Sequence, residues 1–234
     1  MKRTSFLAAS ASLVAAAGAP AVAGVPGGSQ FVERRANFDA AAFAATLNRP
    51  AGIRQLWEAV AFNPKVLSNI KNSFNGLQFG FGFPPNRILM ALAGHGASSS
   101  YGYADAIWAK YRIGEFFGIK DAAGTAIASN VFYPAKSAYD PSSDPDDPAG
   151  TYQDTSLQTL QKRGLVVLTC HTAVEEQARA LVKAGNAPAG MTPSDVADDI
   201  LTHLVPGAVV VPAMVAAIAV LQHEYGYAYT TLAL

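Results

Sequence analysis

The only cysteine of this 234-residue chain lies in the stretch VVLTCHTAVEE, residues 166–176, directly before a histidine. An apolar run typical of a strand ends at Cys170, and a helical pattern opens at Thr172, with Glu175 completing a capping box. Backbone N–H groups at the start of a helix and a nearby imidazolium both stabilise a thiolate. The position therefore predicts a nucleophilic thiol beside His171, able to hold a sulfur atom as a persulfide. The alternative is an inert cysteine at the end of a core strand.

A second histidine, His95, stands between two glycines in LAGHGASSSYG, residues 92–102, again after an apolar run. The glycines allow the backbone to approach another group closely. GHGASS matches half of a dinucleotide-binding fingerprint, but Ser99 replaces the third glycine and no acidic residue ends a plausible second strand. We therefore predict no nucleotide cofactor. His95 is then either a neighbour of Cys170 or part of a structural turn.

Cys170, His171 and His95 form the candidate catalytic set, and they leave one alternative open. Thiolate and imidazole are soft and borderline metal ligands, so the three residues together could hold a metal ion. Three ligands on two loops are thin support, and we predict neither a metal nor another cofactor. The sequence holds no zinc-protease motif around His223 and no G-x-S-x-G elbow of a serine hydrolase.

Strands and helices alternate in the part of the chain that must position these residues. Continuous apolar runs predict strands that are covered on both faces. We expect five strands, at residues 87–93, 125–133, 165–170, 208–212 and 227–234. Helices are expected at 103–118, 156–164, 172–185, 192–207 and 213–226.

This alternation predicts an α/β fold, a three-layer sandwich around a five-stranded parallel sheet. With the flavodoxin-like strand order 2-1-3-4-5, the first and third predicted strands are neighbours. Ligands of such sheets bind beyond the carboxyl ends of the strands. The topology therefore brings His95 close to Cys170.

The N-terminal part of the chain divides differently. Residues 1–23 combine Lys2 and Arg3, an apolar stretch and an A-x-A site, which predicts a signal peptide and export, for example to the periplasm. Residues 24–85 are expected to form a linker and a helical N-terminal extension, in which 38–48, 51–62 and 65–74 are helices. Residues 86–234 are expected to form the α/β domain, with a solvated Pro/Asp/Ser loop at 134–155.

Composition restricts the class of partner. Half of the residues are hydrophobic, 15% are charged, and the formal net charge is zero without a basic cluster. We therefore expect no nucleic-acid partner. No run beyond the signal reaches the roughly 18–20 apolar residues that span a bilayer, so we expect no membrane association after cleavage.

Two segments carry a resemblance to a known family, the DsrE-like proteins of sulfur relay, which include the TusD-type subunits. GLVVLTCHTAVEEQA and LVPGAVVVPAMVAAIAVLQHEYGYAYTTL resemble that family over roughly residues 86–234. The matching residues are Gly164, Cys170, Pro206, Gly207, Gln222, Gly226, Tyr227 and Tyr229. The resemblance implies a flavodoxin-like fold, a homo-oligomer (trimer or hexamer) and sulfur carriage on Cys170.

Two functional hypotheses follow. The first is an exported sulfur carrier or sulfurtransferase, with Cys170 exchanging sulfane sulfur with a small sulfur species or a partner protein, and His95 and His171 tuning the thiolate. The second is a non-enzymatic oligomeric binding module, in which the pocket at the strand ends takes a small ligand or a metal.

Overall fold

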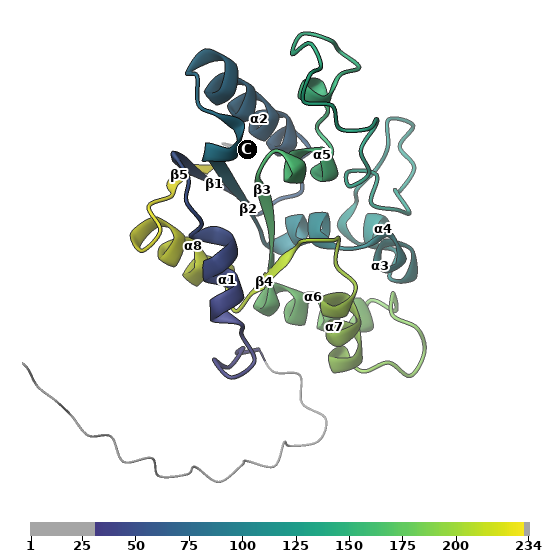
Figure 1. The fold of residues 1–234 in the computed structure, drawn as a ribbon. Coiled ribbons are helices and arrows are strands. Elements are labelled where there is room, and N and C mark those ends of the chain that lie inside the picture. The colour runs from purple at the N-terminus through teal and green to yellow at the C-terminus, as the bar shows by residue number, and fades with distance from the viewer. Residues whose placement is uncertain (1–30, 232–234) are drawn as a thin grey trace, which may run out of the picture.

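The computed structural model describes residues 31–231, so the predicted signal peptide lies outside the described residues. A five-stranded sheet forms the centre of the molecule (Figure 1), and every pair of neighbouring strands is parallel. The strands, in chain order, are β1 (Ile53–Ala59), β2 (Ile88–Gly94), β3 (Leu165–Cys170), β4 (Val209–Val211) and β5 (Ala228–Thr231). Every residue of β2 and β3 is buried, which explains their uninterrupted apolar sequence.

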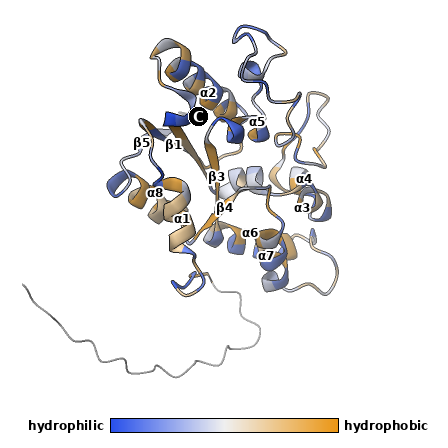
Figure 2. Cartoon of the chain, in the orientation of Figure 1, coloured by the Kyte–Doolittle hydropathy of each residue, from blue (hydrophilic) through white to orange (hydrophobic). Residues whose placement is uncertain are grey.

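Helices cover both faces of the sheet, which confirms the predicted three-layer α/β architecture. One face packs against α1 (Ala40–Leu47) and α8 (Met214–His223). The other packs against α2 (Lys65–Asn75) and α5 (Leu157–Lys162). Figure 2 shows apolar residues concentrated on the strands and on the sides of the helices that face them.

The strand order is β4-β3-β2-β1-β5, which differs from the expected order 2-1-3-4-5. The chain steps across the sheet in one direction from β1 to β4 and then returns past all of them to β5. Connections between parallel strands are right-handed, so the connecting helix changes face when the chain reverses the direction in which it crosses the sheet. For this reason α8, which precedes β5, lies on the face opposite α2 and α5. The expected contact between the strands that end at Gly94 and Cys170 is nevertheless present, because β2 and β3 pair directly.

Two predicted elements are wrong. One expected strand is missing and one unexpected strand is present, so the sheet still has five strands. Residues 51–62 were expected to be helical, yet β1 lies between β2 and β5 inside the sheet. Leu56 and Trp57 are both buried, on opposite faces, as a central strand requires. The sheet therefore begins at residue 53, within the segment that was assigned to a helical extension.

The predicted strand at 125–133 does not form. The segment is a loop with one isolated bridge, between Lys120 and Ala126. The amide of Asn130 fixes this loop, because its Nδ2 donates to the carbonyl oxygens of Tyr101 and Tyr103. Those bonds tie the loop to the turn that follows β2 and satisfy two backbone carbonyls there.

The remaining helices lie around the carboxyl end of β3. They are α3 (Asp105–Lys110), α4 (Ile113–Phe117), α6 (His171–Lys183) and α7 (Pro193–Thr202). The helix expected at 103–118 is split into α3 and α4 because Arg112 adopts a left-handed conformation, with φ of 50°. The predicted cap at Thr192 is confirmed: a capping box with Asp195 starts α7.

Short helical turns complete the chain, at Gly76–Gly80, Pro85–Arg87, Gly96–Gly102 and Thr151–Gln153. Between residues 31 and 231, none of the helices has the length and apolar character needed to cross a membrane.

Candidate functional site

Cys170 is the last residue of β3 and the N-cap of α6. Its Sγ accepts hydrogen bonds from the backbone N–H of Ala173 (N···S 3.4 Å) and of Met214 (N···S 3.2 Å). Met214 is the first residue of α8, so the N-terminal ends of two helices both donate to one sulfur. Donors of this kind stabilise negative charge on sulfur. The side chain is buried, with 5% exposed.

The predicted capping box of Thr172 and Glu175 is wrong, because the sulfur of Cys170 takes the place of the cap. The hydroxyl of Thr172 instead donates to the carbonyl oxygen of Pro212 at 3.0 Å. Thr172 therefore ties the start of α6 to the turn between β4 and α8. That bond helps to hold both helix ends at the thiol.

His171 lies beside Cys170 in sequence, but its hydrogen bond runs to another group. Its Nε2 forms an ion pair with Glu33 Oε2 at 2.9 Å, and the residue is 8% exposed. Its Nδ1 is buried and has no hydrogen-bond partner among the described residues. The imidazole is thus held by the N-terminal segment rather than by the thiol.

His95 is likewise paired with a carboxylate. Its Nε2 lies 2.8 Å from Glu58 Oε1, and Tyr229 donates its hydroxyl proton to the other oxygen of Glu58. Burial raises the pKa of Glu58, but the hydrogen bonds from Tyr229 and His95 outweigh it and hold that pKa below its usual value. The result is a chain of hydrogen bonds across the ends of β5, β1 and β2.

The sequence interpretation missed Glu58, and it named Tyr229 only among the residues that resemble the DsrE-like family. Glu58 was placed in a helix because 51–62 was assigned as one. Had that segment been identified as a strand, its single acidic residue would have stood at a carboxyl end, where ligands of parallel sheets bind. Tyr229 carried no comparable signal.

The glycines around His95 have a packing role. A side chain at Gly94 would place its Cβ 2.8 Å from the carbonyl oxygen of Ser98. Gly96 has φ of 58° and lies against the carbonyl of Val60. Ser98 donates its hydroxyl proton to the carbonyl oxygen of Ala59. These contacts fasten the turn after β2 to the turn after β1.

The structure therefore places Cys170, His171 and His95 at the same edge of the sheet without joining them. Gly94 is in register with Thr169, so the three residues lie at the ends of two neighbouring strands. Each imidazole binds its own carboxylate, at Glu33 and at Glu58, and no hydrogen bond of the described residues links either ring to Sγ. Nor do any three His, Cys, Asp or Glu side chains within 31–231 converge as metal ligands would.

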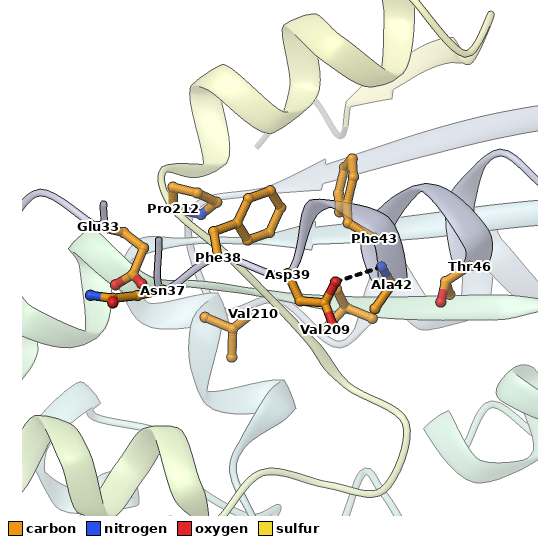
Figure 3. A pocket seen from close by; sticks show the side chains of 10 residues that line it. All are labelled: Glu33, Asn37, Phe38, Asp39, Ala42, Phe43, Thr46, Val209, Val210 and Pro212. Atoms are coloured by element: carbon orange, nitrogen blue, oxygen red, sulfur yellow. Dashed lines mark hydrogen bonds between the residues drawn. The ribbon is translucent and has the colours of Figure 1, made fainter. Parts of the chain in front are cut away.

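Two hollows lie beside the N-terminal segment, residues 31–39, near the carboxyl ends of β3 and β4. The first measures about 250 Å³ and lies between α1, β4 and residues 33–39 (Figure 3). In Figure 3, Glu33 and Asn37 lie next to each other at one end of it, and Asp39 caps α1 through the N–H of Ala42. The second hollow measures about 420 Å³ and shares Glu33 and Asn37 with the first.

The second hollow is polar. His171, Glu175, Ser194 and Asp198 line it together with Glu33 and Asn37. Glu175 is 4% exposed. Burial raises its pKa, attraction by His171 and Arg179 lowers it, and repulsion by Asp198 and Glu33 raises it; the net pKa lies above the usual value for a glutamate.

Comparison with known proteins adds little. No family model and no curated protein matches the chain. One solved structure, of a protein of unknown function from Methanobacterium thermoautotrophicum, aligns with 77% of this chain and 99% of its own. Its sequence identity is 13% and its TM-score is 0.38, and nothing about function is transferred from it.

Proposed function

We propose that this protein carries sulfane sulfur on Cys170. The observation that supports the proposal is the placement of Sγ against the N–H groups of Ala173 and Met214, at the starts of two helices. The same donors that stabilise a thiolate would stabilise the negative charge of a persulfide. The DsrE-like resemblance around Cys170 points to the same chemistry.

The transfer step uses one nucleophile and one leaving group. The thiolate of Cys170 attacks the outer sulfur of a donor persulfide, and a new S–S bond forms at Sγ. The S–S bond of the donor breaks, and the donor leaves as a thiolate. No electrons enter or leave the pair of molecules, and the reverse step with an acceptor thiol returns Cys170 to its starting state.

The histidines have a different role in this proposal from the one that the sequence suggested. Because His171 binds Glu33 and His95 binds Glu58, neither imidazole is a hydrogen-bond partner of the thiol. They hold the strand ends and the N-terminal segment in place around it. Since Cys170 is only 5% exposed, a sulfur donor reaches the thiol when the residues over it open locally.

Intact mass spectrometry tests this proposal. The folded protein is incubated with cysteine persulfide, and then with a thiol acceptor. Addition of one sulfur atom to the native protein, and its loss to the acceptor, are the expected results. The Cys170→Ser variant must show neither. A wild-type protein that gains sulfur only after denaturation would refute the proposal.

A second candidate function is a ligand-binding module in which Cys170 is structural. The burial of the thiol and the pairing of both histidines with carboxylates favour it. In that case the polar hollow lined by His171 and Glu175 is the binding site. The mass experiment separates the two candidates, because a structural cysteine takes up no sulfur in the folded state.

A further inference from the structure

The N-terminal segment, residues 31–39, is held against the start of α6. Glu33 forms an ion pair with His171, the first residue of that helix, and only 14% of the Glu33 side chain is exposed. The carbonyl oxygen of Phe31 lies 3.2 Å from the hydroxyl of Thr172, which is the next residue of the helix. The segment therefore crosses the two residues that directly follow the cysteine in the chain.

The same segment lies over the face of the sheet to which the cysteine contributes. Cys170 belongs to the hydrophobic cluster of the α1 and α8 face, and Phe38 packs against that cluster. On the neighbouring strand, Val211 is in register with Cys170. A hollow of about 220 Å³ lies beside Val211, and Phe38 and Pro212, both drawn in Figure 3, form part of its apolar wall. Phe38 therefore helps to cover the apolar surface next to the thiol.

Few interactions hold the N-terminal segment in place. All of its residues are exposed except Glu33 and Phe38, which are half-buried. Its backbone hydrogen bonds stay local: Asn37 and Phe38 both donate to the carbonyl oxygen of Arg34, and within 31–231 none joins the segment to a backbone group beyond α1. Segments with few buried contacts and an exposed backbone open locally at a lower free energy than the core does. The N-terminal segment is therefore the part of the cover that detaches most easily.

We propose that the N-terminal segment acts as a strap that closes the approach to Cys170, and that a sulfur donor reaches the thiol when this strap detaches. The other route, separation of α6 from α8, would break the hydrogen bond from the N–H of Met214 to Sγ. Detachment of the segment leaves that bond intact, so the thiolate keeps its donors while it reacts. This role rests on the sulfur carriage proposed above, because an inert cysteine needs no controlled access.

Glu33 and Phe31 attach the segment through two different interactions. The ring of Phe31 covers the guanidinium of Arg179, with 3.4 Å between the Arg179 Cζ and the ring centroid, which is a cation–π contact. The pair of Glu33 and His171 is less accessible to water, with 14% and 10% of the two side chains exposed. Hydrogen bonds to charged groups are stronger than neutral ones. Glu33 is therefore the principal attachment and Phe31 the secondary one.

The rate at which iodoacetamide alkylates Cys170 in the folded full chain measures access to the thiol. Glu33→Gln should raise this rate at least about tenfold, the factor that corresponds to about 1.4 kcal/mol. Phe31→Ala should raise it about twofold to fivefold, as expected for a cation–π contact at an exposed site. Because Phe31 is 43% exposed, its variant remains informative even if Glu33→Gln fails to fold. Wild-type rates in both variants would overturn the proposal.

Two controls separate access from the reactivity of the thiol itself. Asp39→Asn removes the same charge from the same segment, and asparagine is also a good N-cap for α1, so the alkylation rate should not change. Detachment multiplies the rate at every pH, whereas a changed pKa of the Cys170 thiol shifts the pH profile of the rate along the pH axis. A Glu33→Gln profile that is only shifted, or an equal acceleration in Asp39→Asn, would overturn the proposal.

Urea distinguishes detachment of the segment from unfolding of the whole protein. Local opening exposes little surface, so the alkylation rate should be nearly independent of urea below the unfolding transition. Suppose instead that the rate rises with urea along the slope of global unfolding, in wild type and Glu33→Gln alike. The thiol would then be reached only through global unfolding, and the segment would not control access.

Sulfur uptake from cysteine persulfide, measured by intact mass in the same variants, separates this proposal from sulfur carriage. The expected result is that Glu33→Gln takes up sulfur faster than wild type and is also alkylated faster. Faster alkylation without sulfur uptake in any variant would refute sulfur carriage and leave the segment as a cover of Cys170. Sulfur uptake by wild type, with equal alkylation and uptake rates in Glu33→Gln, would overturn the strap and leave sulfur carriage intact.

Discussion

Replacing Cys170 by alanine should cost stability through two backbone donors rather than through lost volume alone. The sulfur accepts the N–H groups of Ala173 and Met214 at the starts of α6 and α8. Loss of an N-cap costs about 1 kcal/mol, and a buried donor left without a partner costs about 1–3 kcal/mol. Sulfur is a weak acceptor, so the sum should fall near the low end, at roughly 2–3 kcal/mol.

The Cys170→Ser variant isolates this effect. Serine keeps an acceptor at the same position and is a preferred N-cap, so we expect a loss of at most about 1 kcal/mol. Thr169→Val is a matched control at the preceding residue, because the buried Thr169 hydroxyl has no hydrogen-bond partner in the described chain. Removing that hydroxyl should be neutral or slightly stabilising.

Urea unfolding, followed by circular dichroism, measures all three variants at one pH. The expected order of unfolding free energy is Thr169→Val at or above wild type, then Cys170→Ser, then Cys170→Ala. Thermal midpoints should follow, at about 2–4 °C per kcal/mol for a domain of this size. If alanine and serine at residue 170 proved equally destabilising, the two N–H groups would not depend on an acceptor at Sγ, and the reasoning would be refuted.

Three further predictions concern other parts of the molecule. The pKa of Glu58 is lowered in the folded state, so the ionised carboxylate stabilises the fold above the pKa of the unfolded state, and this contribution is lost as the pH falls through the folded-state pKa. The urea midpoint should therefore fall less between about pH 7 and about pH 3 in Glu58→Gln than in wild type. Arg163 is 5% exposed, its Cζ lies 5.0 Å from the ring centroids of Phe74 and Tyr152, and its guanidinium donates no hydrogen bond in the described chain. Burial lowers the pKa of Arg163 to about 10. Arg163→Met should thus equal or exceed wild type in the urea midpoint, and a loss above about 1 kcal/mol would contradict this view of the guanidinium. Gly94→Ala should lower the free energy of unfolding by about 1–3 kcal/mol, because its Cβ meets the backbone of Ser98. Gly76→Ala is its control: no atom lies within 4 Å of the new Cβ, so this variant should be neutral or more stable by up to about 1 kcal/mol in the same assay.

The sequence identified the elements that are apolar throughout. The strand expected at 165–170 matches β3, and the expected 87–93 differs from β2 by one residue at each end. Thr192 started α7 as expected, because a capping box is formed by residues three positions apart. Such signals are local, so they can be identified without knowledge of the neighbours.

The errors in predicted secondary structure arose in segments whose conformation is decided by contacts with residues far away in the sequence. The segment IRQLWEA of β1 contains Arg54, Gln55 and Glu58, and its pattern suited a helix as well as a strand. Only pairing with β2 and β5 selects the extended form, through bonds to residues that are far apart in the sequence. The opposite error concerns residues 125–133, whose pattern suited a strand, although they form a loop that the side chain of Asn130 ties to the carbonyls of Tyr101 and Tyr103.

The sequence by itself determined the α/β class, the position of Cys170 at the end of a strand, and the start of a helix directly after it. These follow from hydropathy pattern and spacing within a short segment. Only the tertiary structure decided the partners of the candidate residues. The second donor to Sγ comes from Met214, and the carboxylates that hold His171 and His95 come from Glu33 and Glu58. Hydrogen bonds between such distant residues depend on the strand order and on the path of the N-terminal segment, and neither is encoded in any one stretch of the chain.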